Sequence, residues 1–156
     1  MHNIDAFIPQ FQGMRDAKVR LIRWFIFCDL RAGVRFGSNN DVQGNCSSKT
    51  KALITMELAG VDDWVWRDLD AAIQLAKENN VFLLLAFFDF SAMFKPESIS
   101  GVQIGGRTSV FADDWRQDLL INNLVIPVLK RTSGEVNVWG YEVSVQKTSS
   151  QHTFVR

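Results

Sequence analysis

Three apolar, strand-like runs separated by helix-like stretches constrain the fold of this chain more than any other feature. The runs are Val19–Phe27, Val81–Phe88 and Val136–Val143. The first is dense in β-branched and aromatic residues, as strands are. The second is continuously apolar, which is typical of a parallel-sheet strand covered on both faces. Strands that alternate with helices form right-handed parallel βαβ units. The sequence therefore predicts an α/β fold with a parallel sheet.

Apolar residues at helical spacing predict three helices between these runs. The first covers Ile4 to Met14, and the second begins at Asp62 and Asp63 and ends at Asn79-Asn80. The third begins at Asp113-Asp114, has a kink at Pro127 and closes at Gly134, since proline cannot donate a helix hydrogen bond. The residues of this third helix expected to face the core are Trp115, Leu119, Leu120, Leu124 and Val128.

Long loops follow the strands, and only short turns follow the helices. The first loop runs from Asp29 to Gly60, with a short strand or helix expected near Ala52 to Leu58, and the second from Ser91 to about Ala112. Ligands of α/β folds bind at the carboxyl ends of the strands. The loops therefore mark the side of the sheet that we expect to be functional.

Length and charge exclude several classes of partner. The chain has 156 residues, which fits one domain, and its 17 Lys+Arg balance 17 Asp+Glu. Because no basic field exists, neither a nucleic acid nor a membrane surface is expected as a partner. The longest apolar stretch, Val81–Phe88, is too short to span a bilayer. The N-terminus does not resemble a signal peptide, and the localisation stays open.

No residue cluster predicts a metal site or a cofactor. His2 and His152 lie at the two ends of the chain, so neither a metal cluster nor a His-based triad is visible. Cys28 and Cys46 are too far apart for a CxxC motif; a disulfide is geometrically possible, but two free thiols are preferred. The glycine-rich segment 101–107 is interpreted as a flexible loop.

The order of the strand ends resembles a known family. An Arg lies near the end of the first strand (Arg23), Phe88-Asp89-Phe90 ends the second, and Trp139-Gly-Tyr-Glu-Val143 forms the third. Together they are similar to the cellulase- and mannanase-like glycoside hydrolases, which are (β/α)8 barrels. The resemblance covers about residues 4–143 and implies that the domain 1–143 is a partial barrel of three or four parallel strands. Residues 144–156 are polar and unlike a continuation of the family, so we expect a disordered tail there. A small, open, doubly wound sheet is the structural alternative.

The resemblance also implies candidate site residues. The family cleaves β-linked polysaccharides by a retaining, two-carboxylate mechanism, so a polysaccharide or oligosaccharide is the implied partner. Arg23 matches an arginine near the family's nucleophile, and Asp89 matches a position that touches substrate. Trp139 and Tyr141 could line a sugar site, with Val143 on the same face because alternate strand residues share a face. Ordinary structural roles are the alternative for Arg23 and Asp89, and packing is the alternative for Trp139.

The sequence departs from the family at the catalytic tip. The family's Asn-Glu-Pro, whose Glu is the general acid/base, is replaced by Val145 and Gln146, and glutamine cannot transfer the catalytic proton. A second alignment makes Glu142 the acid/base. The nucleophile lies on the family's seventh strand, and a whole barrel needs about 250 residues. We therefore expect a truncated hydrolase-like domain that is inactive alone. The alternative is a non-catalytic α/β interaction module that self-associates through exposed strand edges.

Overall fold

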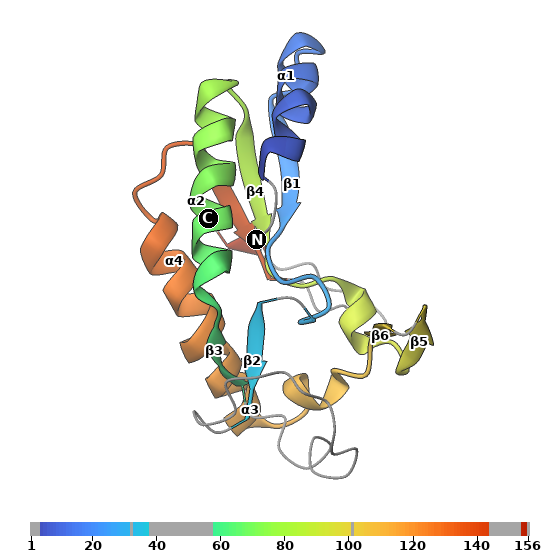
Figure 1. Cartoon of the computed structure of the whole chain (residues 1–156). Helices are drawn as coiled ribbons and strands as arrows, with labels where there is room; N and C mark the ends of the chain where they lie inside the picture. Colours follow the sequence, from blue (N-terminus) through green and yellow to red (C-terminus); the bar gives the residue numbers. More distant parts are fainter. Residues whose placement is uncertain (1–3, 32, 38–57, 101, 144–153, 156) are drawn as a thin grey trace.

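A mostly parallel sheet forms the centre of the computed structural model, which describes residues 4–31, 33–37, 58–100, 102–143 and 154–155 (Figure 1). The strand order is β1-β4-β7-β8. The parallel strands are β1 (Leu21–Phe25), β4 (Phe82–Ala86) and β7 (Val138–Glu142). The two-residue strand β8 (Phe154–Val155), within the tail predicted to be disordered, runs antiparallel to β7. The predicted α/β fold with a parallel sheet is confirmed.

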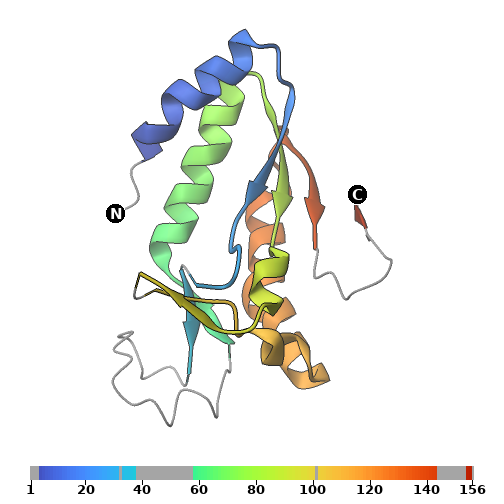
Figure 2. The same ribbon diagram turned by 90° about the vertical axis from the view of Figure 1, so that its right-hand side faces the viewer.

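The helices that alternate with the strands lie on one side of this sheet. They are α1 (Ile8–Asp16), which follows the 3-10 turn η1 (Ile4–Phe7), α2 (Asp63–Glu78) and α4 (Ile126–Thr132). In Figure 2, α1 and α2 lie to the left of the strands and α4 lies behind them. Sequential strand order with helices on one side is the arrangement of a barrel segment, whereas a doubly wound sheet has helices on both faces. The described residues therefore form a partial barrel-like fold.

Helix α2 follows the amphipathic pattern in its sequence. Its buried stripe is Val65, Leu69, Ala72, Ile73, Leu75 and Ala76. Asp63 lies in the first turn, where a carboxylate stabilises the positive end of the helix dipole. The chain leaves the helix through Asn80, which has a left-handed φ of 53°, a conformation that asparagine tolerates better than most residues. The predicted boundaries of this helix are confirmed.

The third predicted helix is interrupted in its middle. It consists of α3 (Asp114–Leu120), a π-helical turn η4 (Ile121–Val125) and α4, which has Pro127 in its first turn. Because proline lacks an N–H, the backbone loosens into a wider turn directly before it. Asn123 in this turn donates to the Leu58 carbonyl at 2.7 Å and so ties the helix to β3. The prediction that Trp115 faces the core was wrong, since this side chain is 46% exposed.

The loops after the strands contain small elements of their own. The first loop holds the antiparallel pair β2 (Val34–Phe36) and β3 (Leu58–Val61). The strand or helix expected near Ala52 to Leu58 falls almost wholly on residues outside the described ranges, and β3 begins at its last position. The second loop carries η2, β5, β6 and η3, which are Phe90–Met93, Glu97–Ile99, Val102–Ile104 and Thr108–Phe111. All these elements lie beyond the carboxyl ends of the strands (Figure 1).

The core lies between the sheet and the helices. Trp24 of β1 packs edge-on against Phe7, and Leu83 and Leu85 of β4 are fully buried. At the strand ends, an aromatic cluster continues the core, with ring centroids 5.6–6.4 Å apart: Phe27, Phe87, Phe88 and Phe111. The expectation that the second strand is covered on both faces holds towards its carboxyl end, where Ala86, Phe87 and Phe88 are buried, but not at its start, where Phe82 is 36% exposed. No helix in the described part is long and apolar enough to cross a membrane.

Candidate functional site

The most specific polar contact at the strand ends joins Arg23 to Glu142. The two residues lie on β1 and β7, which flank β4, and they are 119 positions apart in the sequence. Arg23 Nε donates to Glu142 Oε2 at 2.6 Å, and Arg23 Nη2 donates to Oε1 at 2.6 Å. This is a bidentate pair, in which both carboxylate oxygens accept from one planar guanidinium.

Burial differs between the two partners. Glu142 is 7% exposed, whereas the Arg23 side chain is 46% exposed and lies 4.4 Å from the centre of the Phe25 ring. Because arginine has only donor atoms, both Glu142 oxygens act as acceptors in this pair. The expectation that an arginine in this strand needs an acidic partner is met by Glu142.

Two aspartates follow the parallel strands β4 and β1. Asp89 comes shortly after β4, and its Oδ1 accepts from the Ser91 N–H at 3.2 Å, which caps the short helix η2. Asp29 comes after β1, is buried, and forms an ion pair with Arg31 at 3.0 Å. Asp29 was not predicted as a site residue. The signal was present, because Asp29 follows its strand at nearly the same place as Asp89 follows the next.

The turn that carries Asp29 is strained and holds a thiol. Cys28 and Leu30 both have left-handed φ values, 46° and 62°, at a cost of roughly 1–3 kcal/mol each for non-glycine residues. Cys28 is exposed and free. Desolvation first, then the charges of Asp89 and Asp29, raise the pKa of the Cys28 thiol, and Arg31 opposes them. Cys28 is therefore a poor nucleophile at neutral pH.

The two aromatic residues proposed to line a sugar site are placed differently. The Tyr141 ring lies 6.3 Å from the Phe87 ring, and its hydroxyl is hydrogen-bonded to the Thr132 hydroxyl of α4 at 2.7 Å. Tyr141 therefore points to the helix side of the sheet, away from Glu142. Trp139 lies at a register irregularity, where Leu83 pairs with Val138 and Leu84 with Gly140, and it is 49% exposed.

Some predicted positions fall outside the described residues. Val145 and Gln146, aligned with the family's acid/base motif, are among them, as is Cys46. Val143, expected to share a face with Tyr141, is half exposed at the end of β7.

A groove on the helix side lies away from these strand ends. It has a volume of about 510 Å³ and is lined by residues of α2, α4 and the turn after α4. Four of its charged side chains are paired: Arg131 binds both oxygens of Asp70, and Lys77 binds Glu135. These pairs tie the C-terminal part of the molecule to α2, and we interpret the groove as a seam between helices.

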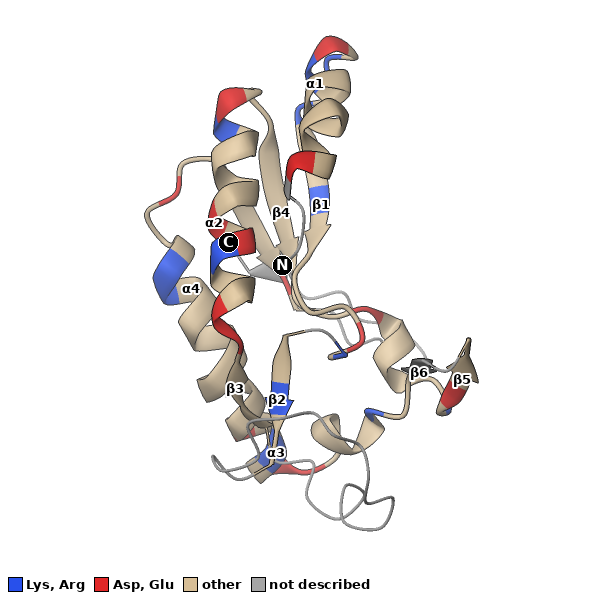
Figure 3. Cartoon of the chain, viewed as in Figure 1, with Lys and Arg blue, Asp and Glu red and all other residues tan. Residues whose placement is uncertain are grey.

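Charged residues of both signs are spread over the described elements. In Figure 3, Lys and Arg (blue) and Asp and Glu (red) are interspersed along the ribbon. Within the described ranges, no group of three His, Cys, Asp or Glu side chains could hold a metal ion.

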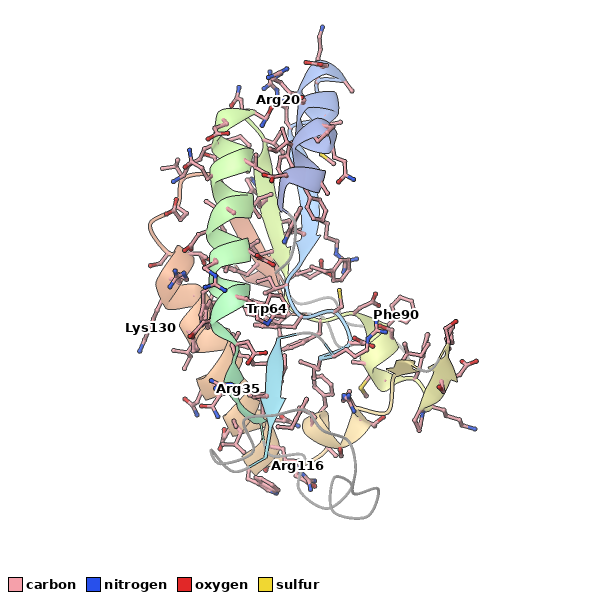
Figure 4. All side chains as sticks on the ribbon, viewed as in Figure 1. Arg20, Arg35, Trp64, Phe90, Arg116 and Lys130 are labelled. Carbon is pink, nitrogen blue, oxygen red and sulfur yellow. The ribbon has the colours of Figure 1, made fainter. Side chains whose placement is uncertain are left out.

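Phe90, directly after Asp89, points into solvent from the strand-end loops (Figure 4).

Comparisons with known proteins show a likeness in fold. No family model matches the sequence, and no curated protein matches it. Among solved structures, the chain is similar to a β-mannanase from the blue mussel Mytilus edulis, with a TM-score of 0.64 and 12% sequence identity. The match covers 89% of this chain and 33% of that chain, so this chain spans about a third of the enzyme's length. At this identity the likeness shows the fold, a partial barrel-like α/β arrangement found within a β-mannanase.

Proposed function

We propose that this chain is a glycoside hydrolase-like barrel segment, related to enzymes that hydrolyse β-linked polysaccharides, without hydrolytic activity of its own. The Arg23–Glu142 pair carries the proposal. Glu142 is a buried carboxylate at the end of a barrel strand, where such enzymes carry their catalytic residues. Arg23 donates to both of its oxygens. The likeness in fold to a β-mannanase supports the relationship.

The chemistry of retaining hydrolysis explains the proposed inactivity. It needs a general acid/base and a carboxylate nucleophile about 5–5.5 Å apart. Each carboxylate at the described strand ends has another partner: Glu142 binds Arg23, Asp29 binds Arg31, and Asp89 caps η2. Loss of the acid/base alone typically costs about 10²- to 10⁴-fold in rate.

The test is release of reducing sugar from mannan and from cellulose by the purified chain. We expect no release above the buffer blank, and no difference between the chain and its Glu142→Ala variant. A β-mannanase assayed in parallel confirms that the substrates are competent. Reducing sugar released by the chain and abolished in Glu142→Ala would contradict the proposed inactivity and make Glu142 the acid/base.

Sugar contact is tested separately from hydrolysis. We propose that Asp89 and Trp139 contact the sugar, whereas Arg23 stays bound to Glu142. Tyr141 does not contact the sugar, because its hydroxyl is bound to Thr132 on the helix side. Calorimetric titration with manno- and cello-oligosaccharides should show weaker binding to Asp89→Ala and to Trp139→Ala than to the unchanged chain. The matched control is Tyr141→Phe, which should bind as the unchanged chain does. Binding lost only in Tyr141→Phe would refute this assignment.

A further inference from the structure

The face of the sheet that the helices leave uncovered carries apolar side chains. Leu21 and Phe82 are register neighbours at the starts of β1 and β4, and they are 44% and 36% exposed. Phe25 and Leu84, on the same face, are partly exposed. We call the surface formed by Leu21, Phe25, Phe82 and Leu84 the open face. In a complete barrel, such side chains fill the interior in packed layers.

An unpaired strand edge adjoins the open face. β1 is the terminal strand in the order β1-β4-β7-β8, and within the described part of the chain no strand pairs with its other side. Its backbone N–H and C=O groups on that side can template pairing with another strand. The opposite edge differs, because β8 pairs with Tyr141 and Glu142 of β7.

The charges on and around this surface suit a partner without net charge, such as a second copy of the chain. Arg23 and Glu142, on the same side of the sheet, neutralise each other, so covering them would bury no unpaired charge. The whole chain carries 17 basic and 17 acidic residues, so two copies approach without net repulsion. A strongly basic or acidic partner would find no complementary field.

We propose that a second copy of this chain covers the open face, with β1 of each copy at the interface, in a symmetric dimer. A twofold-symmetric dimer, in which both subunits use the same surface, is the commonest closed assembly of soluble proteins. A standard interface buries about 800 Å² per partner, and a fully buried phenylalanine contributes only about 150–250 Å². Since the open-face side chains are only partly exposed, the dimer is weak, with a Kd of about 1–100 μM.

The test is sedimentation equilibrium of the purified chain from about 1 to 500 μM, which brackets that Kd. The mass should rise from 17.7 kDa towards twice that value. Leu21→Glu and Phe82→Glu should each raise the Kd at least about tenfold, because the interface would have to desolvate a new charge. Ile121→Glu is the matched control: Ile121 is 44% exposed but lies at the start of η4, outside the open face, and its Kd should not change.

A second measurement does not depend on how the variants fold. Amide hydrogen exchange of the unchanged chain should slow in β1 as its concentration rises across the Kd, while exchange in α3 stays constant. A mass of 17.7 kDa at every concentration would refute the dimer and leave the open face to another partner. Equal weakening by Ile121→Glu, or dimerisation without β1 protection, would place the interface elsewhere and overturn the proposal.

Discussion

The Arg23–Glu142 pair makes an asymmetric prediction for stability. Arg23→Met leaves a carboxylate that is 7% exposed without its partner, and breaking a fully buried pair in this way costs about 3–5 kcal/mol. Because the Arg23 side chain is 46% exposed, water reaches the pair, and we lower the expected loss in unfolding free energy to about 1–3 kcal/mol. Glu142→Gln leaves the charge on the half-exposed arginine, which water can solvate, so its loss should be smaller, about 0.5–1.5 kcal/mol.

Urea denaturation followed by circular dichroism measures these differences. With an m-value of about 1–3 kcal/mol per molar urea, a loss of 2 kcal/mol lowers the midpoint by roughly 1 M. The double variant should lose less than the sum of the single variants, with a coupling energy of about 1–2 kcal/mol. Arg131→Met is the matched control: Arg131 binds Asp70 in the same bidentate way, but both side chains are exposed, so the loss should stay below about 1 kcal/mol.

Two outcomes would contradict this prediction. If Glu142→Gln destabilises the chain more than Arg23→Met, the buried charge is not what the pair compensates. If the coupling energy is near zero, the two side chains do not depend on each other in solution, and the pair no longer supports the proposed inactivity.

Three further predictions rest on single positions. Gly33→Ala should destabilise the chain by about 1–3 kcal/mol, because Gly33 has φ 72° and a new Cβ would overlap a core side chain. Gly13→Ala, on open helix surface, should stabilise the chain by about 0.5–1 kcal/mol. If the urea midpoints of both variants moved in the same direction, this prediction would be refuted. In a chain whose other cysteine is replaced by serine, Cys28 should react with iodoacetamide at pH 8 more slowly than a free thiol. Asp89→Asn should speed this reaction, because removing a negative charge lowers the raised pKa of the thiol. An unchanged rate would exclude the Asp89 charge as a cause. Tyr141→Phe removes the hydrogen bond to α4 and should lower the unfolding free energy by about 0.5–1.5 kcal/mol. No change in thermal unfolding would mean that this bond is not formed.

The elements that the sequence predicted well are those set by local periodicity. The apolar stripe of α2, with Asp63 in its first turn and Asn80 at its exit, defined that helix closely. The apolar run around Leu83 and Leu85 identified the central strand. Trp115 was misjudged because helical spacing does not say how far the covering sheet extends, and this residue lies beyond it.

Strand-end chemistry was predicted in part. Arg23, Asp89 and Glu142 were named from the sequence, and all three lie in or just after parallel strands. That Arg23 binds Glu142 could not be predicted, since the contact spans 119 positions and depends on both strands flanking β4. Tyr141 could not be placed on the helix side either, because a register shift opposite Leu83 and Leu84 breaks the strict alternation on which the sequence argument relied.

By itself, the sequence determined that this chain is an α/β protein of alternating strands and helices, because propensity and periodicity act over a few residues at a time. Only the tertiary structure decided that the helices cover one face and leave Leu21 and Phe82 exposed on the other. It also decided that Glu142, named as a catalytic candidate, is held by Arg23. Both depend on how distant strands are ordered and registered in the sheet, and backbone pairing fixes that order only when the whole sheet forms.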